Sequence, residues 1–184
     1  SARTKGKNYT YATDRDGNRT KIIEVYQNYK PLQESWYVDT VKAGKPIWSP
    51  IYNWDQAPHF IAASFNQPML DQKGKSIGVI GVDLLLSQIS DFLRQIKPSK
   101  SGQVLVIEHN GLLVASSTPG NPFKLIGGVA KRENILNSSN RLIQSTAIFL
   151  KTTYGNFNAI NRSQQLKFKL DGKQQFLEIT PWKD

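Results

Sequence analysis

The chain has 184 residues, 39% of them hydrophobic and 10% aromatic, which is enough to build one large domain or two small ones. It contains no cysteine, and this excludes a disulfide framework, a thiolate metal site and a cysteine nucleophile. The 24 basic and 14 acidic residues give a net charge of +10, but the basic residues are scattered and no nucleic-acid motif accompanies them. We interpret this charge as solvated surface, with lipid headgroups as an alternative neighbour, and expect no nucleic-acid partner.

The first half of the sequence predicts short strands around one short helix. Asp16-Gly17 predicts a hairpin turn, because glycine supplies the left-handed backbone that such turns need, and the spacing from Asp14 does not fit a calcium loop. Residues 31–42 predict the short helix. The expected strands are 20–26, 60–65 and 76–83, the last two joined by a turn at 71–74.

An amphipathic helix and a second set of strands follow. Residues 85–96 repeat apolar side chains at helical spacing, so we expect this helix to bury Ile89, Phe92 and Ile96. A second helical stripe is expected to end at Gly155. The expected hairpins pair 103–108 with 112–116 across Asn110-Gly111, and 164–170 with 174–180 across Asp171-Gly172.

The order strand, helix, strand therefore occurs twice. We expect an α+β fold with two tandem modules, each with a central antiparallel sheet. The predicted boundaries are 1–85 for the first module, 86–98 for a linker helix and 99–184 for the second module. No apolar run approaches the roughly 20 residues of a membrane span, and residues 1–5 lack the apolar core of a signal peptide. The chain is thus either a soluble protein or a piece of a larger one.

Aromatic residues and carboxylates gather between residues 29 and 83. Tyr29, Trp36 and Tyr37 can cover the apolar or cationic side of a small ligand, while Glu34 and Asp83 can fix its orientation. This combination favours a sensor over an enzyme.

Three segments resemble the double Cache sensors of bacterial, cyanobacterial-type, histidine kinases and nucleotide cyclases: 44–52, 78–93 and 180–182. The resemblance implies two PAS-like modules along an N-terminal helix that continues from a membrane span. It places the chain in the extracytoplasmic, periplasmic portion of an inner-membrane protein, with a homodimeric parent and an intracellular output domain. From this resemblance we expect the long helix, the first strands of the first module and the last strand or two of the second module to be absent from these 184 residues.

The same resemblance implies a ligand site. Family members that bind amino acids carry a tyrosine, an arginine five residues later, Trp-Tyr, a Tyr-x-Asp strand and a final aspartate. Glu34 stands at the arginine position, while Ile51 and Asn53 stand at the strand positions, so an amine or a modified amino acid is expected in place of a standard amino acid. The expected ligand-binding residues are Tyr29, Glu34, Trp36, Tyr37, Asn53 and Asp83, with Trp54 as a further candidate.

Other interpretations stay open at this point. Trp36 and Tyr37 can equally be core aromatics with Glu34 in solvent, which would leave a ligand-free structural or interaction module. His59 and His109 have no ligand-spaced partner and are expected in exposed loops. A catalytic function is the third interpretation, because the sequence offers no paired acid and base. We expect no metal and no cofactor.

Overall fold

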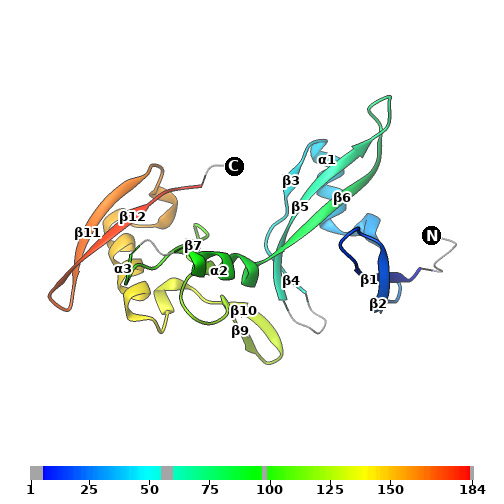
Figure 1. The fold of residues 1–184 in the computed structure, drawn as a ribbon. Coiled ribbons are helices and arrows are strands. Elements are labelled where there is room, and N and C mark those ends of the chain that lie inside the picture. The colour runs from blue at the N-terminus through cyan, green and yellow to red at the C-terminus, as the bar shows by residue number, and fades with distance from the viewer. Residues whose placement is uncertain (1–5, 55–59, 97–98, 183–184) are drawn as a thin grey trace. The chain divides into compact units, whose positions relative to one another are not determined.

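The computed structural model describes residues 6–54, 60–96 and 99–182 (Figure 1). Its described residues form three α-helices and antiparallel strand pairs, which confirms the α+β class. Contacts divide the chain into two compact units, residues 1–50 with 64–82 and residues 51–63 with 83–184. The module boundaries at residues 85 and 98 stay a prediction.

The first unit begins with a hairpin and a short helix, and its last strands continue into the second unit. Strands β5 and β6 run through both units, so each unit is discontinuous in sequence. The elements up to β6 are β1 (Asn8–Thr13), β2 (Arg19–Tyr26), η1 (Pro31–Gln33), α1 (Ser35–Ala43), β3 (Ile47–Trp48), β4 (Tyr52–Trp54), β5 (Phe60–Leu70) and β6 (Ser76–Leu85).

The β1–β2 hairpin turns at the predicted place. The Asp14 carboxylate accepts hydrogen bonds from the backbone N–H groups of Asp16, at 3.0 Å, and Asn18, at 2.8 Å. The side-chain amide of Asn18 also donates to this carboxylate, and chiefly for that reason the pKa of Asp14 lies below its ordinary value. Gly17 has a φ of 82°, as the turn requires. Strand β1 was not predicted.

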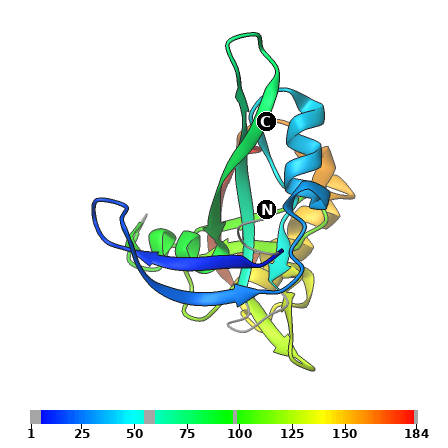
Figure 2. The same ribbon diagram turned by 90° about the vertical axis from the view of Figure 1, so that its right-hand side faces the viewer.

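In the first unit, the buried residues of β5 and α1 include several polar ones. Strands β3 and β4 pair with β5 at different points along it, and β6 also pairs with β5. Helix α1 lies along the β5–β6 ribbon (Figure 2). Thr40, Ser64 and Asn66 are buried, whereas Ile80 and Val82 of β6 are more than half exposed. The unit therefore leaves large aliphatic side chains of β6 uncovered.

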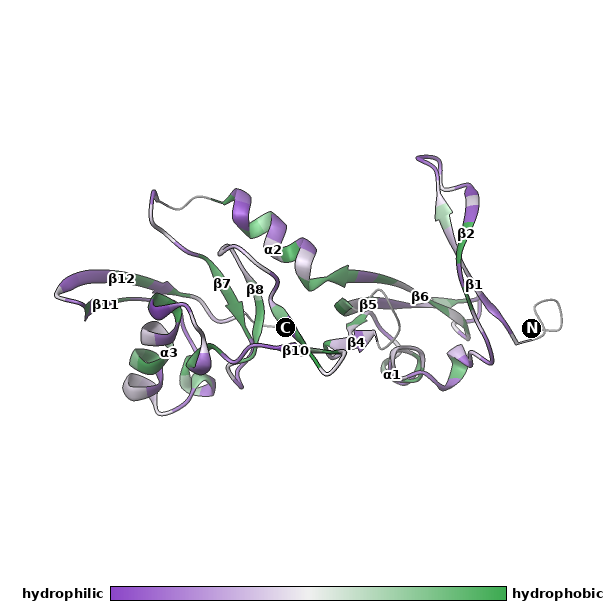
Figure 3. Ribbon diagram, turned by 90° about the horizontal axis from the view of Figure 1, so that it is seen from below, coloured by the Kyte–Doolittle hydropathy of each residue, from purple (hydrophilic) through white to green (hydrophobic). Residues whose placement is uncertain are grey.

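The larger apolar core belongs to the second unit. The buried residues of helix α3 pack with apolar residues of β7, β8, β11 and β12, and Figure 3 shows that β7 and β8 are strongly hydrophobic. The elements of this core are β7 (Leu105–Ile107), β8 (Leu113–Ser116), η2 (Ile135–Asn137), α3 (Arg141–Tyr154), η3 (Phe157–Ala159), β11 (Gln164–Leu170) and β12 (Lys173–Ile179). Gly155 caps α3 with its N–H on the Lys151 carbonyl, as predicted. The antiparallel pairing of this unit is divided among separate hairpins.

A smaller core cluster joins Ile61, Leu86 and Ala130 in the same unit. It holds α2 (Leu86–Gln95) and a hairpin that was not predicted, formed by β9 (Phe123–Ile126) and β10 (Val129–Arg132). Helix α2 lies where the sequence predicted, but its buried residues are Leu86, Ser90 and Leu93. The expected burial of Phe92 and Ile96 is wrong, since these side chains are 60% and 41% exposed.

Candidate ligand-binding site

The beginning of α1 brings three aromatic residues together. Pro31 starts a 3-10 turn, Glu34 follows in an extended conformation, and α1 begins at Ser35. Trp36 and Tyr37 therefore stand in the first helical turn. The indole Nε1 of Trp36 donates a hydrogen bond to the hydroxyl oxygen of Tyr29 at 3.3 Å.

The two aromatic rings of this turn meet edge to face. Their centroids lie 5.8 Å apart with planes at 87°, an arrangement that aromatic pairs prefer. Thr40, one turn further along, is fully buried and donates from Oγ1 to the Trp36 carbonyl at 2.6 Å. The aromatic pair is thus attached to a helical turn that is held from within the unit. We call Tyr29, Trp36 and Tyr37 the aromatic cluster.

Glu34 lies at the edge of this cluster in sequence and at the N-cap of α1 in structure. Its φ and ψ of −71° and 142° suit a cap, but its side chain makes no capping hydrogen bond. The residue is exposed, and within the described residues its carboxylate forms neither a hydrogen bond nor an ion pair. A carboxylate in this state can accept hydrogen bonds from a cationic ligand without losing a protein partner.

The two other predicted site residues stand on strands of the second unit. Asn53 lies in β4, and its Nδ2 donates to the Ala130 carbonyl at 2.7 Å. Asp83 is an exposed residue near the end of β6. Ile51 packs against the Ile61 cluster. The participation of Asn53 and Asp83 in the site stays a prediction.

Sequence reasoning missed Asn66, a buried polar residue on β5. Its side-chain amide donates to the Ser64 carbonyl at 3.2 Å, and the residue is only 1% exposed. A Cβ atom on Gly81 of β6 would overlap the Asn66 side-chain oxygen, so the glycine makes room for the amide. The glycine pair Gly78 and Gly81, three residues apart in an otherwise apolar strand, is the sequence signal that could have indicated this close approach.

Comparison with known protein families gives a match for the first half of the chain. The family model described as "Methyl-accepting chemotaxis protein-like, first PDC sensor domain" matches residues 1–91, which include the aromatic cluster, Glu34 and Asp83. Residues 1–91 are therefore similar to this family of sensor domains. PDC and Cache are names for the same class of sensor domain. The resemblance to Cache sensors that was found in the sequence is therefore confirmed.

Solved structures of sensor domains resemble the fold over nearly all of the chain. The ligand-binding domain of the Campylobacter jejuni chemoreceptor Tlp3, solved with L-valine, has a TM-score of 0.53 and 15% identity over 91% of this chain and 59% of its own. Methyl-accepting chemotaxis protein X has a TM-score of 0.52 and 20% identity over 94% and 56%. The chain spans little more than half the length of these domains. No curated protein matches the sequence.

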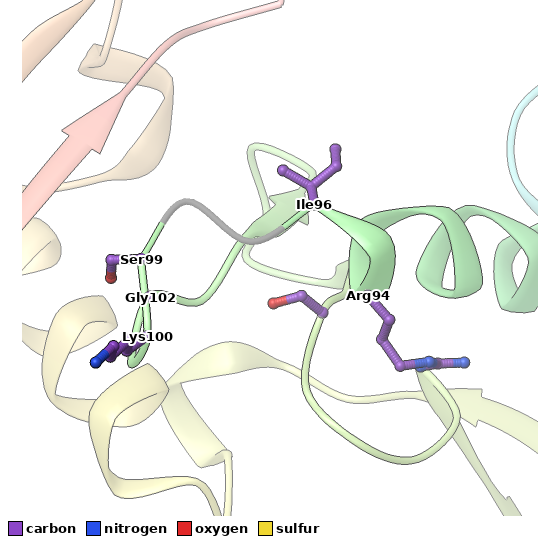
Figure 4. Close-up of a pocket in the computed structure, with 6 residues that line it drawn as sticks. Arg94, Ile96, Ser99, Lys100 and Gly102 are labelled. Atoms are coloured by element: carbon purple, nitrogen blue, oxygen red, sulfur yellow. The ribbon is translucent and has the colours of Figure 1, made fainter.

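Two cavities in the described part of the sensor chain lie away from the aromatic cluster. A cavity of about 620 Å³ in the second unit is lined by residues that include Arg94 and Lys100, whose side chains point away from each other (Figure 4). Arg94 is already bound to Asp91 and to the carbonyls of Thr118 and Gly120. A second, of about 540 Å³, lies beside α3. No predicted site residue lines either cavity.

The remaining sequence candidates add no chemistry to the sensor. His109 is exposed in the turn before β8, as expected, and His59 lies outside the described residues. Within the described ranges, no three histidine or acidic side chains gather closely enough to hold a metal ion. The described helices are also too short or too polar to cross a bilayer.

Proposed function

We propose that the chain is the extracytoplasmic ligand-sensing part of a transmembrane receptor, and that the aromatic cluster binds an amine or a modified amino acid. The match of residues 1–91 to a chemoreceptor-type sensor family supports the sensing role. The observation that carries the ligand proposal is the joined set of Tyr29, Trp36 and Tyr37 beside the free carboxylate of Glu34.

The chemistry of these side chains selects a cation. An ammonium group over an aromatic face gains about 0.5–2 kcal/mol. The Glu34 carboxylate adds a charge-assisted hydrogen bond and would repel a ligand carboxylate at the same place. Asp83 and Asn53 of the second unit stay candidates that rest on the sequence pattern alone. Tlp3 has been solved with L-valine, and an amino-acid derivative with a blocked or distant carboxylate would keep the ammonium that Glu34 can bind.

Signalling would follow from a population shift. A ligand shifts a conformational equilibrium only by its differential affinity for the two states, so the aromatic cluster must bind more tightly in one of them. Strand β6 continues directly into α2, and α2 is bonded to β8 through Ser90 Oγ and the Ser116 N–H at 3.2 Å. We propose that this continuous segment relays the shift to an intracellular output domain of a homodimeric parent.

Thermal-shift measurements followed by calorimetric titration test the ligand. A panel of primary and quaternary amines and amino-acid derivatives is screened, and a ligand at a hundredfold over its Kd adds about 2.7 kcal/mol of stability. Trp36→Ala should abolish binding. Trp48→Ala is the matched control, because Trp48 is 54% exposed and lies tilted against Phe65 outside the cluster. Equal losses in both variants would contradict the aromatic site.

The second candidate is a ligand-free structural or interaction module. It is favoured by one observation, that neither described cavity is lined by a predicted site residue. A panel that leaves the unfolding temperature unchanged at every ligand concentration would support this candidate over the sensor.

A further inference from the structure

The β9–β10 hairpin carries an apolar tip that its own unit leaves uncovered. Leu125, Ile126 and Val129 are 58%, 55% and 45% exposed. Gly127 and Gly128 connect the strands with φ values of 60° and 79°, the backbone of a tight two-residue turn. The hairpin is held directly behind its tip, because Ala130, which pairs with Leu125, is buried in the Ile61 cluster. Figures 1 and 2 show the tip projecting away from the other elements of its unit.

Two lysines form a cross-strand pair two positions behind the turn-flanking pair Ile126 and Val129. Lys124 and Lys131 face each other directly across the strand pair and are both exposed. Like charges in opposite positions destabilise a hairpin, unless an anion lies near them. Arg132 is paired with Glu108 at 2.5 Å, but within the described residues neither lysine has an acidic partner. Residues 117–132 contain no aspartate or glutamate.

We propose that this hairpin docks onto a bilayer that contains anionic lipids. Ile126 pairs with Val129, and the lysine pair lies two residues back on the same face, about 7 Å away at a strand rise of about 3.4 Å per residue. Apolar faces of interfacial segments enter a bilayer by about 5–10 Å, so the aliphatic tip can reach the acyl boundary while the lysines meet headgroup phosphates.

The charge pattern selects this partner over a second copy of the chain. Two copies joined at their tips would bring four lysines together, and each copy carries a net charge of +10. The inference does not use the aromatic cluster and does not depend on the proposed ligand.

Vesicle binding by the full 184-residue chain tests the proposal. The protein is mixed with phosphatidylcholine vesicles, with or without phosphatidylglycerol, and bound protein is measured by flotation. We expect binding only with phosphatidylglycerol and weakening with added salt. Lys124→Glu with Lys131→Glu should lower the partition coefficient by about tenfold or more. Leu125→Ser with Ile126→Ser should also lower it, and circular dichroism checks that these exposed changes leave the fold intact.

A matched control separates docking from net charge. Lys167→Glu with Lys169→Glu makes the same charge change on exposed positions of β11, and should retain most of the binding. Because the chain has no cysteine, Ile126→Cys provides a single site for an environment-sensitive fluorophore, with Ile22→Cys as a similarly exposed control. Fluorescence should shift to the blue on vesicles only for the Ile126 label.

Three results would overturn the proposal. The wild type could fail to bind anionic vesicles, or both lysine pairs could lower binding equally, which would reduce the effect to net charge. The third result is a change in molar mass by light scattering, without vesicles, in the tip variant, because it would identify the tip as a protein contact.

Discussion

At the scale of single residues, the fold of the first unit depends on small side chains and buried amides. Gly81 leaves room for the Asn66 amide, and Thr40 anchors the turn that holds Trp36. Glu34 is exposed at the beginning of the same helix. The proposed ligand-binding role of Glu34 can therefore be tested separately from stability, because substitutions at Glu34 leave the buried set untouched.

Replacement of Gly81 by alanine should destabilise the chain. The new Cβ would overlap the Asn66 oxygen, and overpacking of this kind costs about 1–3 kcal/mol. Gly78→Ala is the matched control, since its Cβ would meet only the flexible end of Met69, at 2.8 Å. Urea unfolding of both variants measures the difference. A smaller effect at Gly81 than at Gly78 would contradict the proposed close packing.

Changes at Glu34 should alter the ligand class. Glu34→Gln should weaken an amine by about 1.5–3 kcal/mol, the value of a hydrogen bond to a charged group. Glu34→Arg should create or strengthen binding of an amino-acid carboxylate. Asp83→Asn should act in the same direction as Glu34→Gln if both carboxylates face one cation. Asp39→Asn, at an exposed position of α1, is the control in calorimetric titration.

At the scale of elements, α2 shows where periodicity indicates a helix but does not identify its buried side. The apolar stripe of residues 85–96 is wide, and it contains both Phe92 and Leu93. The helix begins directly after β6, so the strand determines its rotation, and Leu86, Ser90 and Leu93 face inward. Ser90 is buried because its Oγ accepts the Ser116 N–H, a partner 26 residues away that periodicity cannot reveal.

Leucine and phenylalanine at adjacent positions of α2 should therefore respond differently to truncation. Leu93→Ala should cost about 2–5 kcal/mol, as for other buried leucines. Phe92→Ala removes a larger side chain, but the residue is 60% exposed and the cost should be far smaller. Denaturant unfolding measures both. Equal costs would mean that Phe92 is covered in solution.

Local signals also explain which elements the sequence predicts. Turn glycines and asparagines placed the hairpins at Asp16-Gly17, Asn110-Gly111 and Asp171-Gly172, and Gly155 marked the end of α3. The β9–β10 hairpin was missed because each of its strands has only four residues, which is too short for a clear alternation of apolar and polar side chains. In the site, the neighbours Tyr29, Trp36 and Tyr37 were predicted together, whereas the bond of Asn53 to Ala130 spans 77 residues and leaves no local trace.

At the scale of the whole molecule, β6 presents an edge that the described residues leave open. It pairs with β5, and Ile77, Ile80 and Val82 are 66%, 59% and 68% exposed. An exposed apolar edge strand is a site for pairing with another chain. The large net charge opposes association but is screened by salt.

We therefore expect the isolated chain to self-associate as its concentration and the salt concentration rise. Multi-angle light scattering measures this, and Ile80→Lys should reduce the association by placing a charge on the edge. Ile22→Lys, on an exposed position of β2, is the control. A monomer at all concentrations in high salt would show that the edge does not pair.

The discontinuity of the units also determines when each part can form during synthesis. Domains usually fold in the order in which they leave the ribosome. Here Ile61 can be buried in its core cluster only after Ala130 has been synthesised. The Asn53 amide also needs Ala130, because it donates to the carbonyl of that residue. The β1–β2 hairpin needs only neighbouring residues and can form early. Translation of this chain should therefore leave β5 exposed until the β9–β10 hairpin has emerged, an interval in which a chaperone has access to its apolar residues.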